Sequence, residues 1–212
     1  MRPGWTKSWR CTSLVLAVAL TAPVFPAQRD TAPPREDAPK RANETTLAGL
    51  RPGRDALSAA FKRYKEKYVL SKTSTASKEW RDTCTGHSLA LAIDPRSVVQ
   101  QVTVSLLVPH DGNCDNRRFE FLNLDDWITG KGLRLGDSRN RVVEIYGEPN
   151  SSEPVVRGDA DFELLEFDFG WAGADVPQAM QVYCERDSGR VVEIALLAAT
   201  RLGTKRATNA KE

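Results

Sequence analysis

Two pairs of cysteine and histidine are the residues of this sequence best suited to chemistry. Cys84 stands three residues before His87, and His110 stands four residues before Cys114. Two thiolates and two imidazoles are a common tetrahedral ligand set for zinc. Short hairpin connections between the surrounding segments would bring all four side chains to one edge of a sheet. The sequence therefore allows a zinc site there, and its role would be structural because four protein ligands leave no open coordination position.

The N-terminal segment changes how these cysteines are interpreted. Residues 1–27 place three basic residues ahead of an apolar run from about residue 11 to residue 20, which is the pattern of a secretory signal peptide. The run is shorter than the roughly 20 residues that span a bilayer. We therefore expect cleavage after Ala27, with retention as an N-terminal anchor as the alternative. The mature protein would be periplasmic or secreted.

Export favours a disulfide between Cys84 and Cys114, because exported proteins fold in an oxidising compartment. The bridge would close a loop of about thirty residues and stabilise the fold by roughly 3 kcal/mol. The zinc set of Cys84, His87, His110 and Cys114 is the alternative. We expect Cys184, the remaining cysteine of the mature chain, to be a buried and inert thiol, with an intermolecular bridge as the less favoured alternative.

No sequence signature of an enzyme accompanies these residues. The chain lacks the nucleophile elbow, the zinc-protease motif, the phosphate loop and the dinucleotide fingerprint. Its 30 basic and 28 acidic residues leave a net charge of +2, which gives no basis for nucleic-acid binding. The acidic run 159–168 lacks the spacing of a calcium loop, and alternation places Glu163 and Glu166 on opposite faces of a strand. We predict a non-enzymatic protein without a cofactor.

Aromatic residues near the expected strand ends suggest another function. Such side chains anchor protein interfaces because they bury a large area at small entropic cost. We expect Trp80 and Trp127 to cover the core. Trp171 lies in a loop punctuated by Gly and Pro, and we assign it to a partner-binding site together with Phe169 and Tyr183.

Two stretches of the chain repeat, which bears on how such a site is positioned. Gly49-Leu50-Arg51-Pro52-Gly53 matches Gly132-Leu133-Arg134-Leu135-Gly136 at an offset of 83 residues. Val98-Val99 matches Val191-Val192 at an offset of 93 residues. Two matches in the same order indicate an internal duplication with an insertion of ten residues in the second copy. Chance similarity between short apolar strands is the alternative.

Each copy begins with a predicted helix. In the second copy, Asp137 or Ser138 can cap a helix whose apolar face includes Val142 and Tyr146, and Gly147 can end it. In the first copy, Asp55 is the expected cap. The apolar stripe of that longer helix has the following members: Ala56, Leu57, Ala60, Phe61, Tyr64 and Tyr68.

Three predicted strands follow each helix. They cover about residues 78–84, 88–93 and 98–108 in the first copy, and about 162–169, 179–184 and 190–198 in the second. Short connections favour antiparallel meanders. A short helix is expected from Leu122. We predict an α+β protein of two tandem units, each a helix or helix pair followed by a three-stranded meander, with sheets that can join edge to edge into one concave sheet.

These features resemble a known small fold. The sequence from Gly132 to Pro149, followed by a meander that ends in Gly-Arg-Val-Val-Glu-Ile-Ala-Leu-Leu, is similar to the BamE/SmpA lipoproteins of the barrel-assembly machinery. The tandem arrangement resembles the secreted beta-lactamase inhibitory proteins. The resemblance extends from about Leu47 to Leu197 and implies the fold. The lipobox of the lipoproteins is absent, and no set of inhibitor contact residues matches, so no specific partner follows from it.

The chain is therefore expected to contain five segments. They are a signal peptide (1–27), a disordered linker rich in proline and charge (28–46), a first repeat (47–116), a second repeat (117–200) and a flexible basic tail (201–212). The predicted function is an exported, monomeric protein-binding module, such as an envelope-assembly or inhibitor-like scaffold, with no membrane span after signal cleavage. The alternative is a zinc-binding protein or metal-dependent enzyme.

Overall fold

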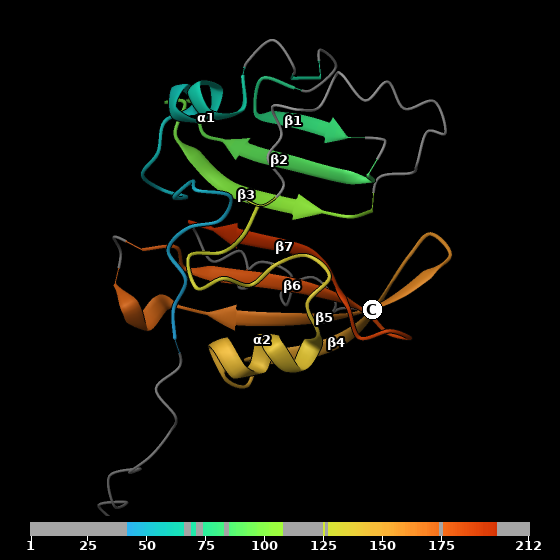
Figure 1. The fold of residues 1–212 in the computed structure, drawn as a ribbon. Coiled ribbons are helices and arrows are strands. Elements are labelled where there is room, and N and C mark those ends of the chain that lie inside the picture. Colours follow the sequence, from blue (N-terminus) through green and yellow to red (C-terminus); the bar gives the residue numbers. More distant parts are fainter. Residues whose placement is uncertain are drawn as a thin grey trace, which may run out of the picture. The chain divides into compact units, whose positions relative to one another are not determined.

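The described residues of the chain form one antiparallel sheet of seven strands and two α-helices (Figure 1), which confirms the predicted α+β class. The computed structural model describes residues 42–65, 69–70, 74–82, 85–107, 125, 127–173 and 176–198. The elements in chain order are α1 (Leu57–Tyr64), β1 (Ser77–Asp82), β2 (His87–Ile93), β3 (Val99–Ser105), α2 (Arg139–Tyr146), β4 (Ser151–Arg157), β5 (Ala160–Asp168), the 3-10 turn η3 (Gly170–Ala172), β6 (Ala179–Glu185) and β7 (Val191–Leu197).

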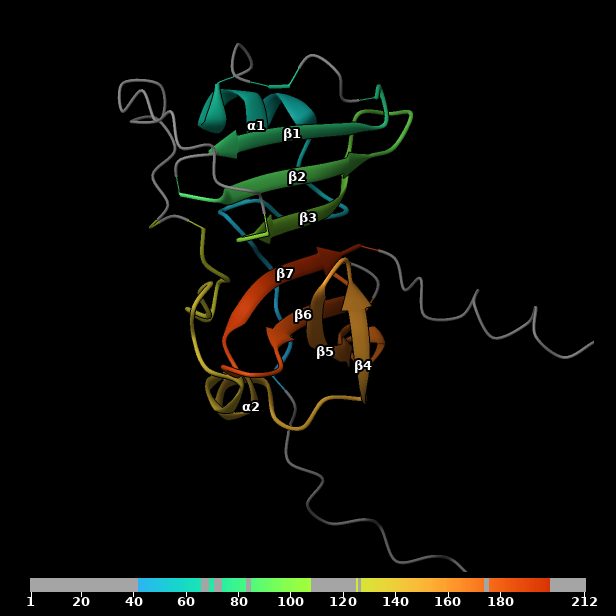
Figure 2. The same ribbon diagram turned by 90° about the vertical axis from the view of Figure 1, so that its right-hand side faces the viewer.

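The strands lie in the order β1-β2-β3-β7-β6-β5-β4. Figure 2 shows this order from top to bottom as far as β5, with β4 beside β5. Six of them occupy the predicted ranges to within a few residues. The sequence analysis missed β4, an edge strand whose side chains are mostly exposed, so it has no apolar alternation. Its Pro154 suits an edge, because proline cannot donate to a further strand.

The second helix begins and ends as predicted, whereas the predicted cap of the first is wrong. The Ser138 hydroxyl accepts from the Arg141 amide at 3.2 Å, and Gly147 follows the last turn with φ of 77°. The N-cap of α1 is Ala56, which makes no side-chain capping bond. Asp55 lies one residue too early to cap, and its carboxylate accepts from the Arg51 amide at 2.8 Å instead. Tyr68 lies outside the described residues.

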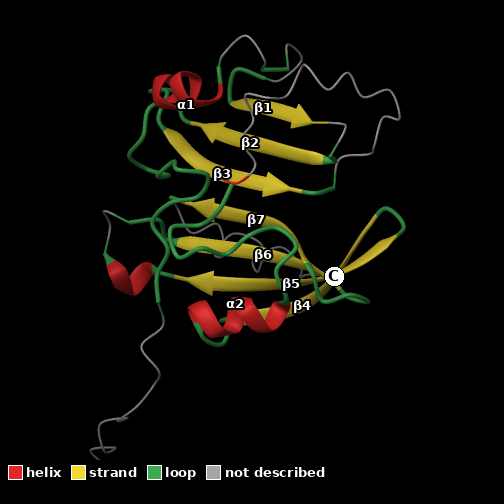
Figure 3. Ribbon diagram, viewed as in Figure 1, coloured by secondary structure: helices red, strands yellow, loops and turns green. Residues whose placement is uncertain are grey.

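Both helices pack on the same face of the sheet, as the red helices and yellow strands of Figure 3 show. Trp80 and Trp127 are 0% and 2% exposed, which confirms their predicted place in the core. We call the opposite side of the sheet the far face. It carries a smaller apolar cluster whose members are Phe162, Leu164 and Tyr183, with Val155 and Val192 packed against them. Among the described residues, no helix is both long and apolar enough to cross a bilayer.

Several contacts occur twice, once in each half of the chain. The Val99 amide donates to the Asp55 carbonyl at 2.9 Å, and the Val191 amide donates to the Asp137 carbonyl at 2.8 Å. The register of β2 with β3 shifts between Ala92 and Ile93, and that of β6 with β7 shifts between Tyr183 and Cys184. In these contacts Val99 occupies the position that Val191 occupies in the other half, whereas the sequence match paired Val99 with Val192. The duplication itself stays a prediction.

Aromatic packing under the helices is repeated as well. The rings of Tyr64 and Trp80 lie 5.8 Å apart at 57°, and those of Tyr146 and Phe167 lie 5.7 Å apart at 55°. Each pair joins the last residue of a helix to the strand beneath it. The same helix-on-sheet packing therefore serves both halves.

The register of the central strands β3 and β7 is symmetric about one residue pair. Thr103 lies opposite Ala195, 92 residues further along the chain, and Val99 and Val191 are separated by the same 92 residues. Thr103 and Ala195 are themselves related by this offset, so exchanging the two halves of the chain leaves this pair unchanged. A local two-fold axis through this pair would produce such a register, as it does in isologous interfaces.

The end of the predicted linker is folded. Glu44 is only 1% exposed. The Gly130 amide donates to the Thr46 carbonyl and the Ala48 amide donates to the Ile128 carbonyl, both at 3.0 Å. We call residues 42–48 the strap, because this segment of the first half runs beside residues 128–130 of the second. Ile128 lies in the segment where a short helix was expected, but it forms an isolated β-bridge.

Candidate functional site

Trp171 is the most exposed aromatic side chain among the described residues, at 61%. It lies in η3, between β5 and β6. The Ala172 amide donates to the Phe169 carbonyl at 2.8 Å, and the Gly170 amide donates to the Asp168 carboxylate at 2.8 Å. On the other side, the Gln178 side-chain amide donates to the Gly173 carbonyl at 2.7 Å. These bonds hold the turn that presents the indole to solvent.

Phe169 has a different role from the one predicted. Its side chain is 1% exposed and belongs to the main core. Since a buried ring offers no surface to a partner, Phe169 is removed from the candidate contact set. It anchors the base of the turn that carries Trp171.

Tyr183 lies on the far face and is 8% exposed, because another side chain covers it. The Arg157 guanidinium carbon lies 3.7 Å from the centre of the Tyr183 ring, a distance typical of a cation–π contact. Arg157 Nη1 also donates to Glu193 Oε1 at 3.0 Å. Burial raises the pKa of the Tyr183 phenol. The sequence analysis selected Tyr183 and missed Arg157, because Arg157 belongs to the strand it did not predict.

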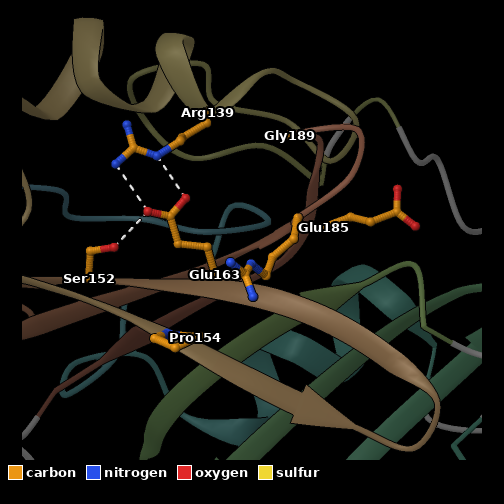
Figure 4. A pocket seen from close by; sticks show the side chains of 7 residues that line it. Arg139, Ser152, Pro154, Glu163, Glu185 and Gly189 are labelled. Carbon is orange, nitrogen blue, oxygen red and sulfur yellow. Dashed lines mark hydrogen bonds and ion pairs between the residues drawn. The ribbon is translucent and has the colours of Figure 1, made fainter.

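A polar cavity of about 340 Å³ lies between the N-terminus of α2, the β4–β5 hairpin and the turn after β6. Arg139 Nε and Nη2 donate to the Glu163 carboxylate at 2.8 and 3.1 Å, and the Ser152 hydroxyl donates to it at 2.6 Å (Figure 4). These hydrogen bonds, chiefly the one from Arg139, lower the pKa of Glu163. Glu163 is thus held ionised and already paired, which suits a structural ion pair better than general acid catalysis.

Cys184 pairs with Glu163 across strands β5 and β6. Its thiol is free and 1% exposed, and burial raises its pKa to about 11. The expected burial of Cys184 is confirmed. A thiol with so little thiolate at neutral pH is a poor nucleophile.

Three of the four predicted zinc or disulfide residues, Cys84, His110 and Cys114, lie outside the described residues. His87 is described, and its Nδ1 lies 2.8 Å from the Thr85 hydroxyl. Its ring meets that of Trp127 edge-on at 6.0 Å. Within the described part of the chain, no group of three potential metal ligands comes together. The disulfide and the zinc set therefore stay predictions.

Comparisons with known proteins add little to this site. No protein-family model matches the chain, and no curated protein matches it. One solved structure, a DUF4309 family protein (YjgB) from Bacillus subtilis, is similar over 74% of this chain and 88% of its own. Its sequence identity is 10% and its TM-score is 0.40. That level of similarity carries no functional argument, and the resemblance to the BamE/SmpA and inhibitory proteins stays a prediction.

Proposed function

We propose that this protein is an exported, non-enzymatic module that binds another protein through the turn carrying Trp171. One observation carries the proposal: a tryptophan that is 61% exposed is held on a hydrogen-bonded turn whose base is fixed by a buried phenylalanine. Side chains that dominate protein interfaces are enriched in tryptophan, and a fixed turn reduces the entropy lost on binding.

The proposed scaffold is a duplicated α/β unit whose two copies share one sheet. The repeated backbone bonds, the register shifts found in both halves and the similar ring distances of Tyr64–Trp80 and Tyr146–Phe167 support this interpretation. The register at Thr103–Ala195 supports a two-fold relation between the copies. A feature present in only one copy of a duplicated unit is a candidate for function, because the shared fold does not require it. The connection from Asp82 to His87 is shorter than the one from Asp168 to Ala179, which carries Trp171.

Export is proposed from the N-terminal sequence, and the protein would act as a monomer in the periplasm or outside the cell. The ion-paired Glu163 and the buried Cys184 support a binding role over catalysis, because neither side chain is available to take up or donate a proton near neutral pH.

Site-specific photo-crosslinking tests the proposal. A photoreactive phenylalanine analogue is placed at position 171 of the full chain in the cells that make it, with position 58 as the matched control. Ser58 is also exposed and lies on α1. We expect discrete protein adducts from position 171 and none from position 58. Identical adduct patterns from both positions, or no adduct from position 171, would rule out this contact.

A further inference from the structure

We infer that Tyr183 and Glu193 form a guanidinium-binding site on the far face of the sheet, filled in this structure by the chain's own Arg157. An arginine side chain of a protein partner can take the place of Arg157 there. This inference deepens the proposed function, and its biological use rests on that function.

The contact with Arg157 shows which chemistry the site accepts. The guanidinium carbon lies 3.7 Å from the centre of the Tyr183 ring, and Nη1 reaches the Glu193 carboxylate at 3.0 Å. A planar cation that stacks on a ring while donating a hydrogen bond sideways is what guanidinium offers and ammonium does not. The site should therefore prefer arginine to lysine.

Tyr183 and Glu193 lie on inner strands of the sheet, whereas Arg157 lies on its edge strand. Tyr183 and Glu193 pair with each other in the centre of the sheet, on β6 and β7. Arg157 is the last residue of the edge strand β4, beside the hairpin turn, and its side chain remains 38% exposed. Rotation of that side chain would vacate the site while the strands that form it remain in place.

Charge on the far face favours a cation in this place. The negative charges of Glu193 and Glu166 both interact with Tyr183. The Glu166 carboxylate accepts hydrogen bonds from the Gln181 side-chain amide and the Ser151 hydroxyl, both at 2.8 Å. Those two donors are neutral. Removal of Arg157 would leave two carboxylates near one aromatic face, so the vacant site attracts a cation.

The test uses the full chain and two small probes, N-acetyl-arginine amide and its lysine counterpart. Arg157→Met removes the cation and its hydrogen bond to Glu193, so that the shorter neutral side chain no longer competes for the site. Binding is followed by NMR of isotope-labelled tyrosine rings. We expect Arg157→Met to bind the arginine probe about tenfold more tightly than the wild type, because the internal competitor is gone. We expect the lysine probe to bind about fivefold more weakly than the arginine probe.

Three further variants guard against indirect effects. Glu193→Gln in the Arg157→Met background should lose most of the arginine binding. Arg141→Met is the matched control, because Arg141 forms an exposed ion pair with Glu144 on α2, and it should leave binding unchanged. Arg157→Lys keeps a cation of weaker fit and should give intermediate binding, so the inference stays testable if Arg157→Met does not fold.

Equal binding of both probes, or no gain on removing Arg157, would overturn the inference and make Arg157 a clamp of the hairpin only. These measurements involve no partner protein. Their failure would leave the crosslinking result at position 171 untouched, and the reverse also holds.

Discussion

Tyr146 donates its hydroxyl hydrogen to Glu44 at 2.6 Å, although 102 residues separate them in the chain. Glu44 also accepts from the Lys131 amide at 3.1 Å. Gly130 leaves the space for it, since a Cβ there would lie 2.7 Å from the carboxylate. The corresponding Tyr64 of the first half donates to the Ala48 carbonyl instead. The strap therefore ties the start of the fold to the second half through a buried, hydrogen-bonded carboxylate.

Loss of the Glu44 carboxylate should destabilise the whole fold. Glu44→Ala removes the acceptor of the Lys131 amide and leaves the Tyr146 hydroxyl with Thr129 Oγ1, at 2.8 Å, as its remaining partner. We expect the free energy of unfolding to fall by about 2 to 3 kcal/mol. Tyr146→Phe should cost about 1 to 2 kcal/mol, and more than Tyr64→Phe, whose hydroxyl donates to a neutral carbonyl. Urea unfolding of the single and double variants measures the coupling. Additive effects of Glu44→Ala and Tyr146→Phe would contradict the assigned contact.

Two neighbouring aromatic residues should respond in opposite ways. Trp171→Ala should change the free energy of unfolding by less than about 0.5 kcal/mol, because the side chain is mostly exposed. Phe169→Ala should lower it by about 3 to 5 kcal/mol, because it leaves a cavity in the main core. Chemical denaturation of the two variants checks both values. A large loss from Trp171→Ala would mean that Trp171 supports the fold and is no independent contact residue.

The repeated turns permit a matched exchange. Ser97 and Gly189 each lie two residues before a central strand, β3 or β7, and have φ of 63° and 65°, a conformation that disfavours side chains. Ser97→Gly should raise the free energy of unfolding by about 0.5 kcal/mol, because relief of strain exceeds the added entropy of the unfolded chain. Gly189→Ser should lower it by about 1 kcal/mol, and a Cβ there meets no atom within 4 Å. Thermal unfolding of the two variants measures both changes. If both changes have the same sign, the proposed equivalence of the two turns is wrong.

The ion pair between Arg139 and Glu163 should give a pH-dependent contribution to stability. The hydrogen bond from Arg139 lowers the pKa of Glu163 in the folded state. Its contribution is therefore complete above the unfolded pKa of about 4.3 and is lost as the pH falls through the lower folded pKa. Both side chains are partly exposed, so the contribution should be no more than about 1 kcal/mol.

Comparison of the wild type with Glu163→Gln isolates this contribution from that of the other carboxylates. The difference in free energy of unfolding should be constant from about pH 7 to pH 5 and should shrink toward about pH 3. A difference that grows on acidification would reverse the assigned sign.

The sequence predicted the regular elements because their signals are local. The hydroxyl of Ser138 and the glycine at 147 define the ends of α2, and alternating apolar residues define the strands under the helices. The predicted cap Asp55 is wrong because a carboxylate near a helix start can accept from amides of the helix or from amides of the preceding loop. Both sets of amides lie at a similar distance from Asp55 in sequence, so only the tertiary structure shows which set it binds.

The candidate site was predicted less completely, because its contacts join residues far apart in sequence. Tyr183 was selected for its type, but its cover, Arg157, comes from an edge strand without apolar alternation. Glu44 lies in a stretch whose composition is that of a linker, and its burial and its bonds with Tyr146 and Lys131 are tertiary features that composition does not predict. Trp171 is exposed, as its assignment to a partner-binding loop requires, whereas the burial of Phe169 depends on packing in the main core.

Affinity for the protein captured at position 171 tests the central claim most directly. The purified partner is titrated against the wild type, Trp171→Phe, Trp171→Ala and the control Arg141→Met. The account predicts that Trp171→Ala weakens binding at least about tenfold, that Trp171→Phe weakens it less, and that Arg141→Met leaves it unchanged. Wild-type affinity in a folded Trp171→Ala variant would contradict the claim that this turn is the binding site.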